Sequence, residues 1–292
     1  MRGPGIARRW AVPAALAIVG AVLVFIGAPT VAAVAPLKHP YLALGDSITF
    51  GYVSSPSAAD GSEPYANAAN FTGYPTYVGA SLGLQTVNAA CPGETSTSLL
   101  ALGAPDAGCA SYSGANPLHI PYSGLTQLQF AAAYLQSHPD TKLVTVAIGI
   151  NDIGLAVPRC GGLRNTACLQ RSLPLVLSTL RTNLTTIVHT LRATGAGATI
   201  VLVNYYALEY RNAEAVTIVR SLDASIAQVG AQEHLRVADS FDAFKLASDA
   251  TNGDACTSGL FPSGASTLGP CDLHPNDAGQ HVLASAVEAA LR

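Results

Sequence analysis

Positive charge is scarce in this sequence and is nowhere concentrated. The 292 residues include 15 Lys and Arg against 18 Asp and Glu. Three of the basic residues, Arg2, Arg8 and Arg9, precede residue 36, so the remainder carries 12 basic against 18 acidic residues, a formal net charge of −6. Proteins that bind nucleic acid present a clustered basic face. The sequence therefore argues against a nucleic-acid partner.

Features that mark zinc sites, repeat arrays and multidomain chains are also missing. The chain has no Cys-x-x-Cys pair and no neighbouring histidine pattern of the kind that holds zinc, so we expect no metal site. No internal repeat and no clear linker follow residue 40. About 255 residues are ample for one hydrophobic core and small for two. We expect a single domain over residues 36–292.

The chain has one long apolar run, close to its first residue. Three arginines precede an almost uninterrupted apolar stretch at 10–27, and small residues follow at 31–35. This layout is typical of a secretory signal peptide, so we predict a leader over residues 1–35, cleaved after Ala33 or Ala35, and an extracellular protein. The alternative is an uncleaved membrane anchor, because about 18 apolar residues are near the lower limit for crossing a bilayer.

Six cysteines follow the predicted leader, which is an even number in a chain that we expect to be exported. This combination predicts three disulfides. Six cysteines allow 15 connectivities, and sequence alone does not choose among them. We favour pairs that are close in sequence, since each would close a loop between a strand and a helix: Cys91–Cys109, Cys160–Cys168 and Cys256–Cys271.

Short apolar runs alternate with longer amphipathic segments. The runs are rich in Val, Ile and Leu, as in parallel strands buried on both faces, and lie at 41–44, 84–88, 143–148, 199–204 and 235–238. Helical patterns lie at 74–82, 125–136, 169–193, 214–231 and 276–291. We expect Pro174 near the first turns of the third helix, or at a kink. The alternation indicates an α/β protein, a three-layer α/β/α sandwich around a central, mostly parallel, five-stranded sheet.

A serine directly follows the first predicted strand. Residues 45–51 read Gly-Asp-Ser-Ile-Thr-Phe-Gly, which places Ser47 at the sheet edge where ligands of α/β proteins bind. Gly93 follows the second strand and Asn151 the third. The N–H groups of Ser47 and Gly93 and the side-chain amide of Asn151 are suited to hold a developing oxyanion. Each residue also has a simpler interpretation, as a helix cap, a turn glycine, and a turn residue or cap.

A nucleophilic serine requires a base that takes its proton. Of the seven histidines, His274 stands out because it precedes Pro275 and the last predicted helix. Asp272 could orient its imidazole and stabilise the protonated form, although an ordinary loop aspartate is the alternative. Asp46 adjoins Ser47, and we expect its side chain to point away from the hydroxyl and to have a structural hydrogen-bonding role.

Four segments together resemble the SGNH hydrolases, also called the GDSL lipase/esterase family. They are Gly45-Asp46-Ser47, the Gly93 segment, Gly149-Ile150-Asn151-Asp152 and His274-Pro275, and the likeness covers about residues 40–290. The contexts Thr126-Gln127-Leu128 and Ala278-Gly279 are similar to those of secreted actinobacterial members. The resemblance implies a flavodoxin-like fold, Ser47 as nucleophile, Gly93 and Asn151 as oxyanion donors, and His274 as base.

One position departs from the family pattern. The family's acid usually lies three residues before the histidine, where this chain has Cys271, and Asp272 lies only two before. Some relatives resemble a dyad instead, in which a main-chain carbonyl orients the imidazole, so both arrangements stay open. The Gly-x-Ser-x-Gly elbow of ordinary α/β-hydrolases is absent around Ser47, which in the related family accompanies an open site and broad substrate tolerance.

These residues lead us to expect a secreted serine esterase that hydrolyses carboxylic esters through an acyl-enzyme on Ser47. No metal or organic cofactor is needed. Short-chain esters, phospholipids and acylated sugars all suit such a site, so the partner is a small-molecule, lipid or glycan ester, and we expect a monomer. The alternatives are an acyltransferase on the same site, in which an alcohol replaces water, and a non-catalytic glycan-binding protein of the same fold.

Overall fold

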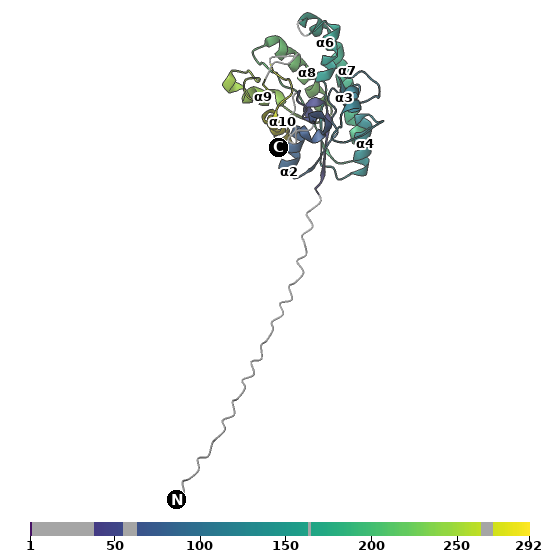
Figure 1. Ribbon diagram of the computed structural model, residues 1–292. Helices are drawn as coiled ribbons and strands as arrows, with labels where there is room; N and C mark the ends of the chain where they lie inside the picture. The colour runs from purple at the N-terminus through teal and green to yellow at the C-terminus, as the bar shows by residue number, and fades with distance from the viewer. Residues whose placement is uncertain (2–37, 55–62, 163–164, 264–270) are drawn as a thin grey trace. The chain divides into compact units, whose positions relative to one another are not determined.

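A five-stranded, all-parallel sheet forms the centre of the structure (Figure 1). Apart from Met1, the computed structural model describes residues 38–54, 63–162, 165–263 and 271–292, and the predicted leader lies outside this part. The strand order is β2-β1-β3-β4-β5, with β1 at Pro40–Gly45, β2 at Gln85–Asn88, β3 at Leu143–Ala147, β4 at Thr199–Val203 and β5 at Arg236–Ala238. The five predicted strands are confirmed.

The order of the strands reverses at β1. The chain pairs β2 with one edge of β1 and β3 with the other, so that Leu42 is in register with both Val87 and Val144. All of β1 is buried, as an apolar run requires when helices cover both faces of a sheet. In such sheets ligands bind beyond the carboxyl ends of the strands at the point of reversal. The residues that follow β1 and β3 therefore occupy the expected position of a ligand site.

Helices form a layer on each side of the sheet (Figure 1). On one side α10 packs against α2 and α9, and on the other α7 packs against α4 and α8. Their bounds are α2 Tyr74–Leu82, α4 Gln127–Ser137, α7 Thr166–Ala193, α8 Ala213–Gln232, α9 Ser240–Ala247 and α10 Asp277–Leu291. This arrangement confirms the three-layer sandwich and the five predicted helices. No helix within the described ranges combines the length and the apolar character needed to cross a membrane.

The long helix α7 starts earlier than its apolar pattern suggests. The side chain of Asn165 accepts a hydrogen bond from the Cys168 amide and caps the helix, which begins at Thr166. Pro174 therefore lies in the third turn, deeper in the helix than we predicted. The sequence placed the start of the helix too late because the capping residue precedes the first buried leucine, Leu169, by a full turn.

Shorter helices occupy segments for which the sequence predicted neither helix nor strand. The α-helical turns are α1 Ser47–Phe50, α3 Cys109–Ala115, α5 Ile150–Gly154 and α6 Ala156–Arg159, and the 3₁₀ turns are η1 Pro64–Ala66, η2 Ala68–Asn70 and η3 Asp249–Thr251. Two of them, α1 and α5, directly follow β1 and β3. They therefore lie at the ends of the two strands that meet at the reversal point.

All six cysteines are paired, in the local connectivity that the sequence favoured. The disulfides are Cys91–Cys109, Cys160–Cys168 and Cys256–Cys271. The first encloses the segment that follows β2, and the third ends directly before Asp272. Two of the three bridges thus restrain loops that carry predicted site residues.

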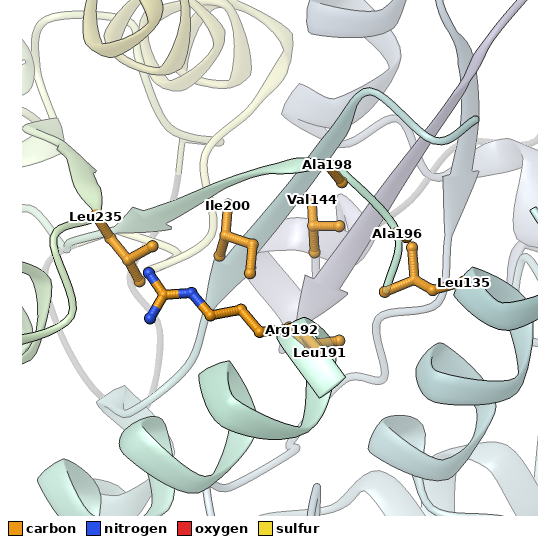
Figure 2. Close-up of a pocket in the computed structure, with 8 residues that line it drawn as sticks. All are labelled: Leu135, Val144, Leu191, Arg192, Ala196, Ala198, Ile200 and Leu235. Atoms are coloured by element: carbon orange, nitrogen blue, oxygen red, sulfur yellow. The ribbon is translucent and has the colours of Figure 1, made fainter. Parts of the chain in front are cut away.

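A small cavity of about 100 Å³ lies at the amino ends of the strands (Figure 2). Its walls are apolar and include Val144 of β3 and Ile200 of β4, and Arg192 at the end of α7 lines it as well. The Arg192 guanidinium donates to Glu233 at 2.8 Å. Because Ser47 follows the opposite, carboxyl end of β1, this cavity is not part of the predicted site.

Candidate active site

Ser47 is the first residue of α1, and its hydroxyl does not cap the helix. Asp46 is the cap, since its Oδ1 accepts from the Ile48 amide at 3.0 Å. The other oxygen, Oδ2, accepts from the Tyr205 hydroxyl at 2.7 Å. The interpretation of Ser47 as an N-cap is therefore wrong, and the structural hydrogen-bonding role predicted for Asp46 is confirmed. Burial raises the pKa of Asp46 to about 6, against the opposing effect of the hydrogen bonds from Tyr205 and Ile48.

Ser47, His274 and Asp272 form a continuous hydrogen-bonded chain. The Ser47 Oγ lies 3.0 Å from His274 Nε2, and His274 Nδ1 lies 2.8 Å from Asp272 Oδ1. A carboxylate can only accept, so Nδ1 carries the proton and Nε2 is the acceptor for the serine hydroxyl. The His274 side chain is 13% exposed, so it is largely shielded from water but still partly open to solvent.

The Asp272 carboxylate is held from three sides. Its Oδ1 accepts from both Nδ1 and the backbone amide of His274, and its Oδ2 accepts from the Ser54 amide at 2.7 Å. Burial alone would raise the pKa of Asp272, but the hydrogen bonds from His274 and Ser54 outweigh it and hold that pKa well below its ordinary value. The position three residues before His274 is occupied by Cys271, which is joined to Cys256 and offers no carboxylate.

Two of the three predicted oxyanion donors, Gly93 and Asn151, are connected through Glu94, the residue that follows Gly93. Gly93 has φ +87°, and a Cβ there would lie 2.7 Å from the Ala107 carbonyl group, so a glycine is required. Asn151 is the second residue of α5, and its Nδ2 donates to the carbonyl oxygen of Glu94 at 2.9 Å. The amide group has two hydrogens, and within the described residues the second one has no partner. It is available for a ligand.

The loop that carries Gly93 is joined to the strand that carries the serine. The Cys91 amide donates to the Gly45 carbonyl at 3.1 Å, and Gly93 and Ser47 each follow two residues later. With the bond from Asn151 to the same loop, the predicted donors and the predicted nucleophile are brought to one end of the sheet. The structure thus assembles the predicted residues from four separate parts of the chain.

An aromatic residue that the sequence analysis did not single out packs against His274. The Tyr52 ring meets the imidazole edge-on, with 4.8 Å between ring centroids, and lies parallel to Phe71 at 5.9 Å. The hydroxyl groups of Tyr52 and Tyr65 are 3.4 Å apart. Tyr52 follows α1 in the chain, so its proximity to Ser47 was visible in the sequence, but its contact with His274 was not.

The part of the chain that contains these residues matches one known protein family. A family model described as "GDSL-like Lipase/Acylhydrolase family" matches residues 43–282, which include all five predicted site residues. The chain belongs to the GDSL-like lipase/acylhydrolase family. Membership in it supports a hydrolase that acts on esters. No curated protein sequence matches the chain significantly.

Solved structures with a similar fold include a phospholipase, a lipase and an esterase. A phospholipase A1 from Streptomyces albidoflavus NA297 is 20% identical, with a TM-score of 0.58 over 87% of this chain and 100% of that one. An extracellular lipase from Streptomyces rimosus is 18% identical, with a TM-score of 0.56 over 87% and 100%. An acetylxylan esterase from Geobacillus stearothermophilus is 18% identical, with a TM-score of 0.51 over 87% and 95%. At these identities the likeness establishes the SGNH-hydrolase-like fold alone.

Asp152, in α5 of the GDSL-like domain, connects two segments that carry site residues. The sequence analysis named it only as part of a motif. Its carboxylate accepts from the amide and the hydroxyl of Ser96, at 2.9 and 2.5 Å. Because Asp152 follows Asn151 directly, these bonds fix α5 to the loop that follows β2. A carboxylate after the asparagine was visible in the sequence, but its partner was not.

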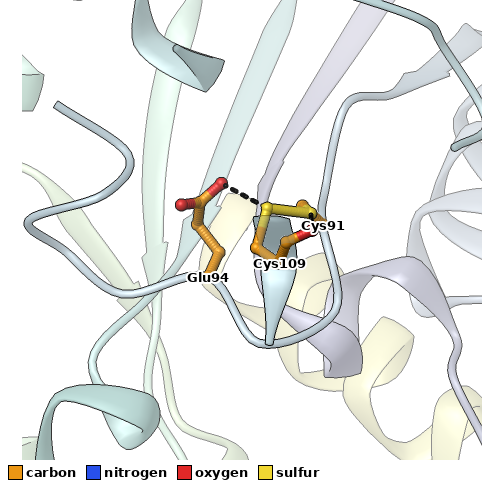
Figure 3. A group of neighbouring side chains, drawn as sticks. All are labelled: Cys91, Glu94 and Cys109. Atoms are coloured by element: carbon orange, nitrogen blue, oxygen red, sulfur yellow. Dashed lines mark hydrogen bonds between the residues drawn. A yellow bond between two sulfur atoms is a disulfide. The ribbon is translucent and has the colours of Figure 1, made fainter. Parts of the chain in front are cut away.

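One group of three potential metal ligands lies close together in the described part of the chain: Cys91, Glu94 and Cys109 (Figure 3). The two sulfur atoms are joined in a disulfide, so neither is a thiolate that could bind a cation. This group is therefore not suited to hold a metal.

A cavity of about 330 Å³ is lined by residues of the segment between β2 and α4, which includes Glu94. This volume falls in the range of small-molecule sites. Its walls are mostly apolar and include two leucines that are exposed to solvent, Leu102 and Leu125. Polar residues line it as well, and Glu94 and Gln127 are among them.

Proposed function

We propose that this protein is a serine esterase in which Ser47 is the nucleophile, His274 the base and Asp272 the residue that orients the imidazole. The observation that carries the proposal is the Ser47 Oγ to His274 Nε2 distance of 3.0 Å, with Asp272 on the opposite ring nitrogen. In this arrangement His274 can take the hydroxyl proton while the serine oxygen attacks, and Asp272 holds the imidazole in the required orientation.

The reaction would proceed through an acyl-enzyme. Ser47 Oγ attacks the ester carbonyl carbon while its proton passes to His274 Nε2. The amide groups of Ser47, Gly93 and Asn151 stabilise the oxyanion. The tetrahedral intermediate collapses, the alcohol leaves with the proton from His274, and water repeats the sequence to release the acid. Ionised Asp272 stabilises the imidazolium in both halves of the reaction.

The substrate class stays within carboxylic esters. A phospholipase A1, a lipase and an acetylxylan esterase are among the structures of similar fold, so lipid esters and acetylated sugars are both candidates. We also propose that the protein is exported. Three disulfides support this, because they persist in oxidising compartments, and so does the predicted leader.

A serine-directed phosphonate tests the proposal on the unmodified enzyme. We expect the protein to hydrolyse p-nitrophenyl acetate, and a fluorophosphonate to stop the reaction in proportion to the label incorporated. Mass mapping of the labelled protein should place the adduct on the peptide that contains Ser47. An adduct on another serine, or full inactivation without any adduct, would contradict the assignment.

The side chain of Asn151 should be needed for rate rather than for binding. Replacing Asn151 with alanine removes one oxyanion donor, and we expect kcat to fall by about 10²–10³-fold with little change in KM. Steady-state kinetics with p-nitrophenyl acetate measure both. Asn212→Ala is the control, because Asn212 caps α8 and its loss should affect thermal stability alone. A loss in kcat below about threefold for Asn151→Ala would remove this residue from the oxyanion hole.

A further inference from the structure

Gln127 makes a two-point contact with the strand that leads to Ser47. Its side chain is buried at the start of α4, and its Oε1 accepts from the Gly45 amide at 2.6 Å. Its Nε2 donates to the Gly45 carbonyl oxygen at 3.0 Å. A backbone amide can only donate, so this pairing fixes which way the side-chain amide faces. The turn between β1 and α1 is therefore held by a residue 82 positions away.

The same Nε2 group also donates to Glu94, which directly follows Gly93. The distance from Gln127 Nε2 to Glu94 Oε2 is 3.2 Å. The other carboxylate oxygen, Oε1, accepts from the Ser98 hydroxyl. Oε2 also lies 3.5 Å from the sulfur of Cys109, which has no hydrogen in the disulfide, so that approach is a packing contact (Figure 3).

Glu94 touches the other oxyanion donor through its main chain. Its carbonyl oxygen accepts from Asn151 Nδ2 at 2.9 Å. A single residue thus contacts Asn151 with its backbone and Gln127 with its side chain, and Gln127 in turn contacts Gly45. All three proposed oxyanion donors are linked through this pair of buried polar residues, neither of which takes part in the reaction described above.

We propose that Gln127 and Glu94 are positioning residues, which hold the Gly93 loop and Asn151 in register with the nucleophile turn so that the three oxyanion donors point at one atom. The inference rests on the proposed function. An oxyanion hole stabilises the transition state only where its donors are fixed before the reaction, and a misplacement of about 1 Å can cost about 10²-fold in rate.

The charge on Glu94 makes this link sensitive to pH. Burial, together with the negative charges of Asp106 and Asp46, raises the pKa of Glu94 to about 7, against the lowering effect of the hydrogen bonds from Ser98 and Gln127. The ionised carboxylate accepts from both Ser98 and Gln127, and such charge-assisted bonds are about twice as strong as neutral ones. Protonation near neutral pH would therefore weaken the bond to Gln127.

The replacement of Glu94 by glutamine imitates the protonated side chain at every pH. Above the pKa of Glu94 the wild type is ionised and the variant is not, so we expect kcat of Glu94→Gln to be lower by about tenfold at about pH 8.5. Below that pKa both side chains are neutral, so the ratio of the two kcat values should approach one at about pH 5.5. Contributions to the pH dependence that the two enzymes share cancel in this ratio.

A second pair of variants tests the link from the side of Gln127. Gln127→Met keeps the length of the side chain but removes its hydrogen bonds to Gly45 and Glu94. We expect kcat for p-nitrophenyl acetate to fall by about 10–10²-fold with KM changed less than about threefold. Gln129→Met is the matched control: Gln129 lies in the same helical turn, is exposed, and bonds only to Thr126 in the described structure, so kcat should not change.

The outcomes separate this inference from the proposed function. A wild-type protein without esterase activity would refute the function. An active wild type with a Glu94→Gln ratio that is constant across pH, or equal to one throughout, would refute the positioning role of Glu94 alone. Unchanged kcat in a folded Gln127→Met protein would refute the role of Gln127. Thermal unfolding of each variant at both pH values establishes that the folded protein is being compared.

Discussion

Alanine in place of Ser47 should abolish hydrolysis of p-nitrophenyl acetate. The variant lacks the oxygen atom that forms the acyl-enzyme in the proposed mechanism, while His274 and Asp272 keep their own hydrogen bond. In an enzyme with a Ser-His-Asp triad on another fold, removal of the nucleophile lowers kcat on the order of 10⁶-fold. Ser47 is 7% exposed and its hydroxyl contacts only His274 in the described structure, so the fold should tolerate the change. Initial rates of purified variant and wild type, measured at matched concentrations, decide the matter.

Ser113→Ala is the matched control for this experiment. Ser113 is exposed on α3, and its hydroxyl donates only to the backbone carbonyl of Cys109 one turn earlier. Its replacement should leave the rate unchanged. If Ser47→Ala retained more than about 1% of the wild-type rate, with no contaminating enzyme in the preparation, the nucleophile would have to be sought elsewhere.

The strands were predictable because burial on both faces leaves a simple pattern. In the run from Leu143 to Ala147 every residue is buried, and a continuous Val- and Leu-rich segment is the sequence pattern of such a strand. The long helices were predictable for a related reason, since their buried residues recur at helical spacing, as Leu173, Leu177, Leu180 and Leu184 do in α7.

The short helices were not predictable from the sequence. The helical turns α1 and α5 are four and five residues long, and isolated helices of this length are not stable. Each depends on a partner that is distant in the chain: Asp46, which caps α1, bonds to Tyr205, and Asp152 in α5 bonds to Ser96. Tertiary contacts, rather than local preference, decide these elements.

The candidate site divides in the same way. Ser47, Gly93 and Asn151 each follow a strand, so the parallel topology alone predicted that they would meet, and the motif around His274 added the base. The hydrogen bonds of Gln127 and Glu94 could not be predicted, because their partners are distant in the sequence. Gln127 bonds to Gly45 across 82 positions and to Glu94 across 33. The sequence did contain Thr126-Gln127-Leu128 as a recognisable context, but no residue in it reveals a partner.

Asparagine in place of Asp272 should have the second-largest effect on rate. The carboxylate accepts on both sides, from His274 at Oδ1 and from the Ser54 amide at Oδ2. An amide side chain can accept on one side only. If its oxygen faces His274, its NH₂ group opposes the Ser54 amide. If its oxygen faces Ser54, its NH₂ group faces Nδ1 of His274. The imidazole proton then moves from Nδ1 to Nε2, and Nε2 can no longer take the proton of Ser47.

Both orientations lower the rate, and the second abolishes the required tautomer, so we expect kcat of Asp272→Asn to fall on the order of 10⁴-fold. This figure also distinguishes the two arrangements that the sequence left open. If a main-chain carbonyl oriented the imidazole, the substitution would cost less than about tenfold. Asp277→Asn is the control, because Asp277 lies in the first turn of α10 and bonds to Tyr77, away from His274.

The pH dependence of this variant should differ from that of Glu94→Gln. Since its hydrogen bonds hold the pKa of Asp272 below the ordinary value, the wild-type carboxylate stays ionised through the whole neutral range. The loss in kcat of Asp272→Asn should therefore persist between about pH 6 and pH 8.5, whereas the loss in kcat of Glu94→Gln should disappear toward acidic pH. A loss that disappeared toward pH 6 would mean that the wild-type Asp272 is already protonated there, which is incompatible with an ionised carboxylate bound to His274 and Ser54.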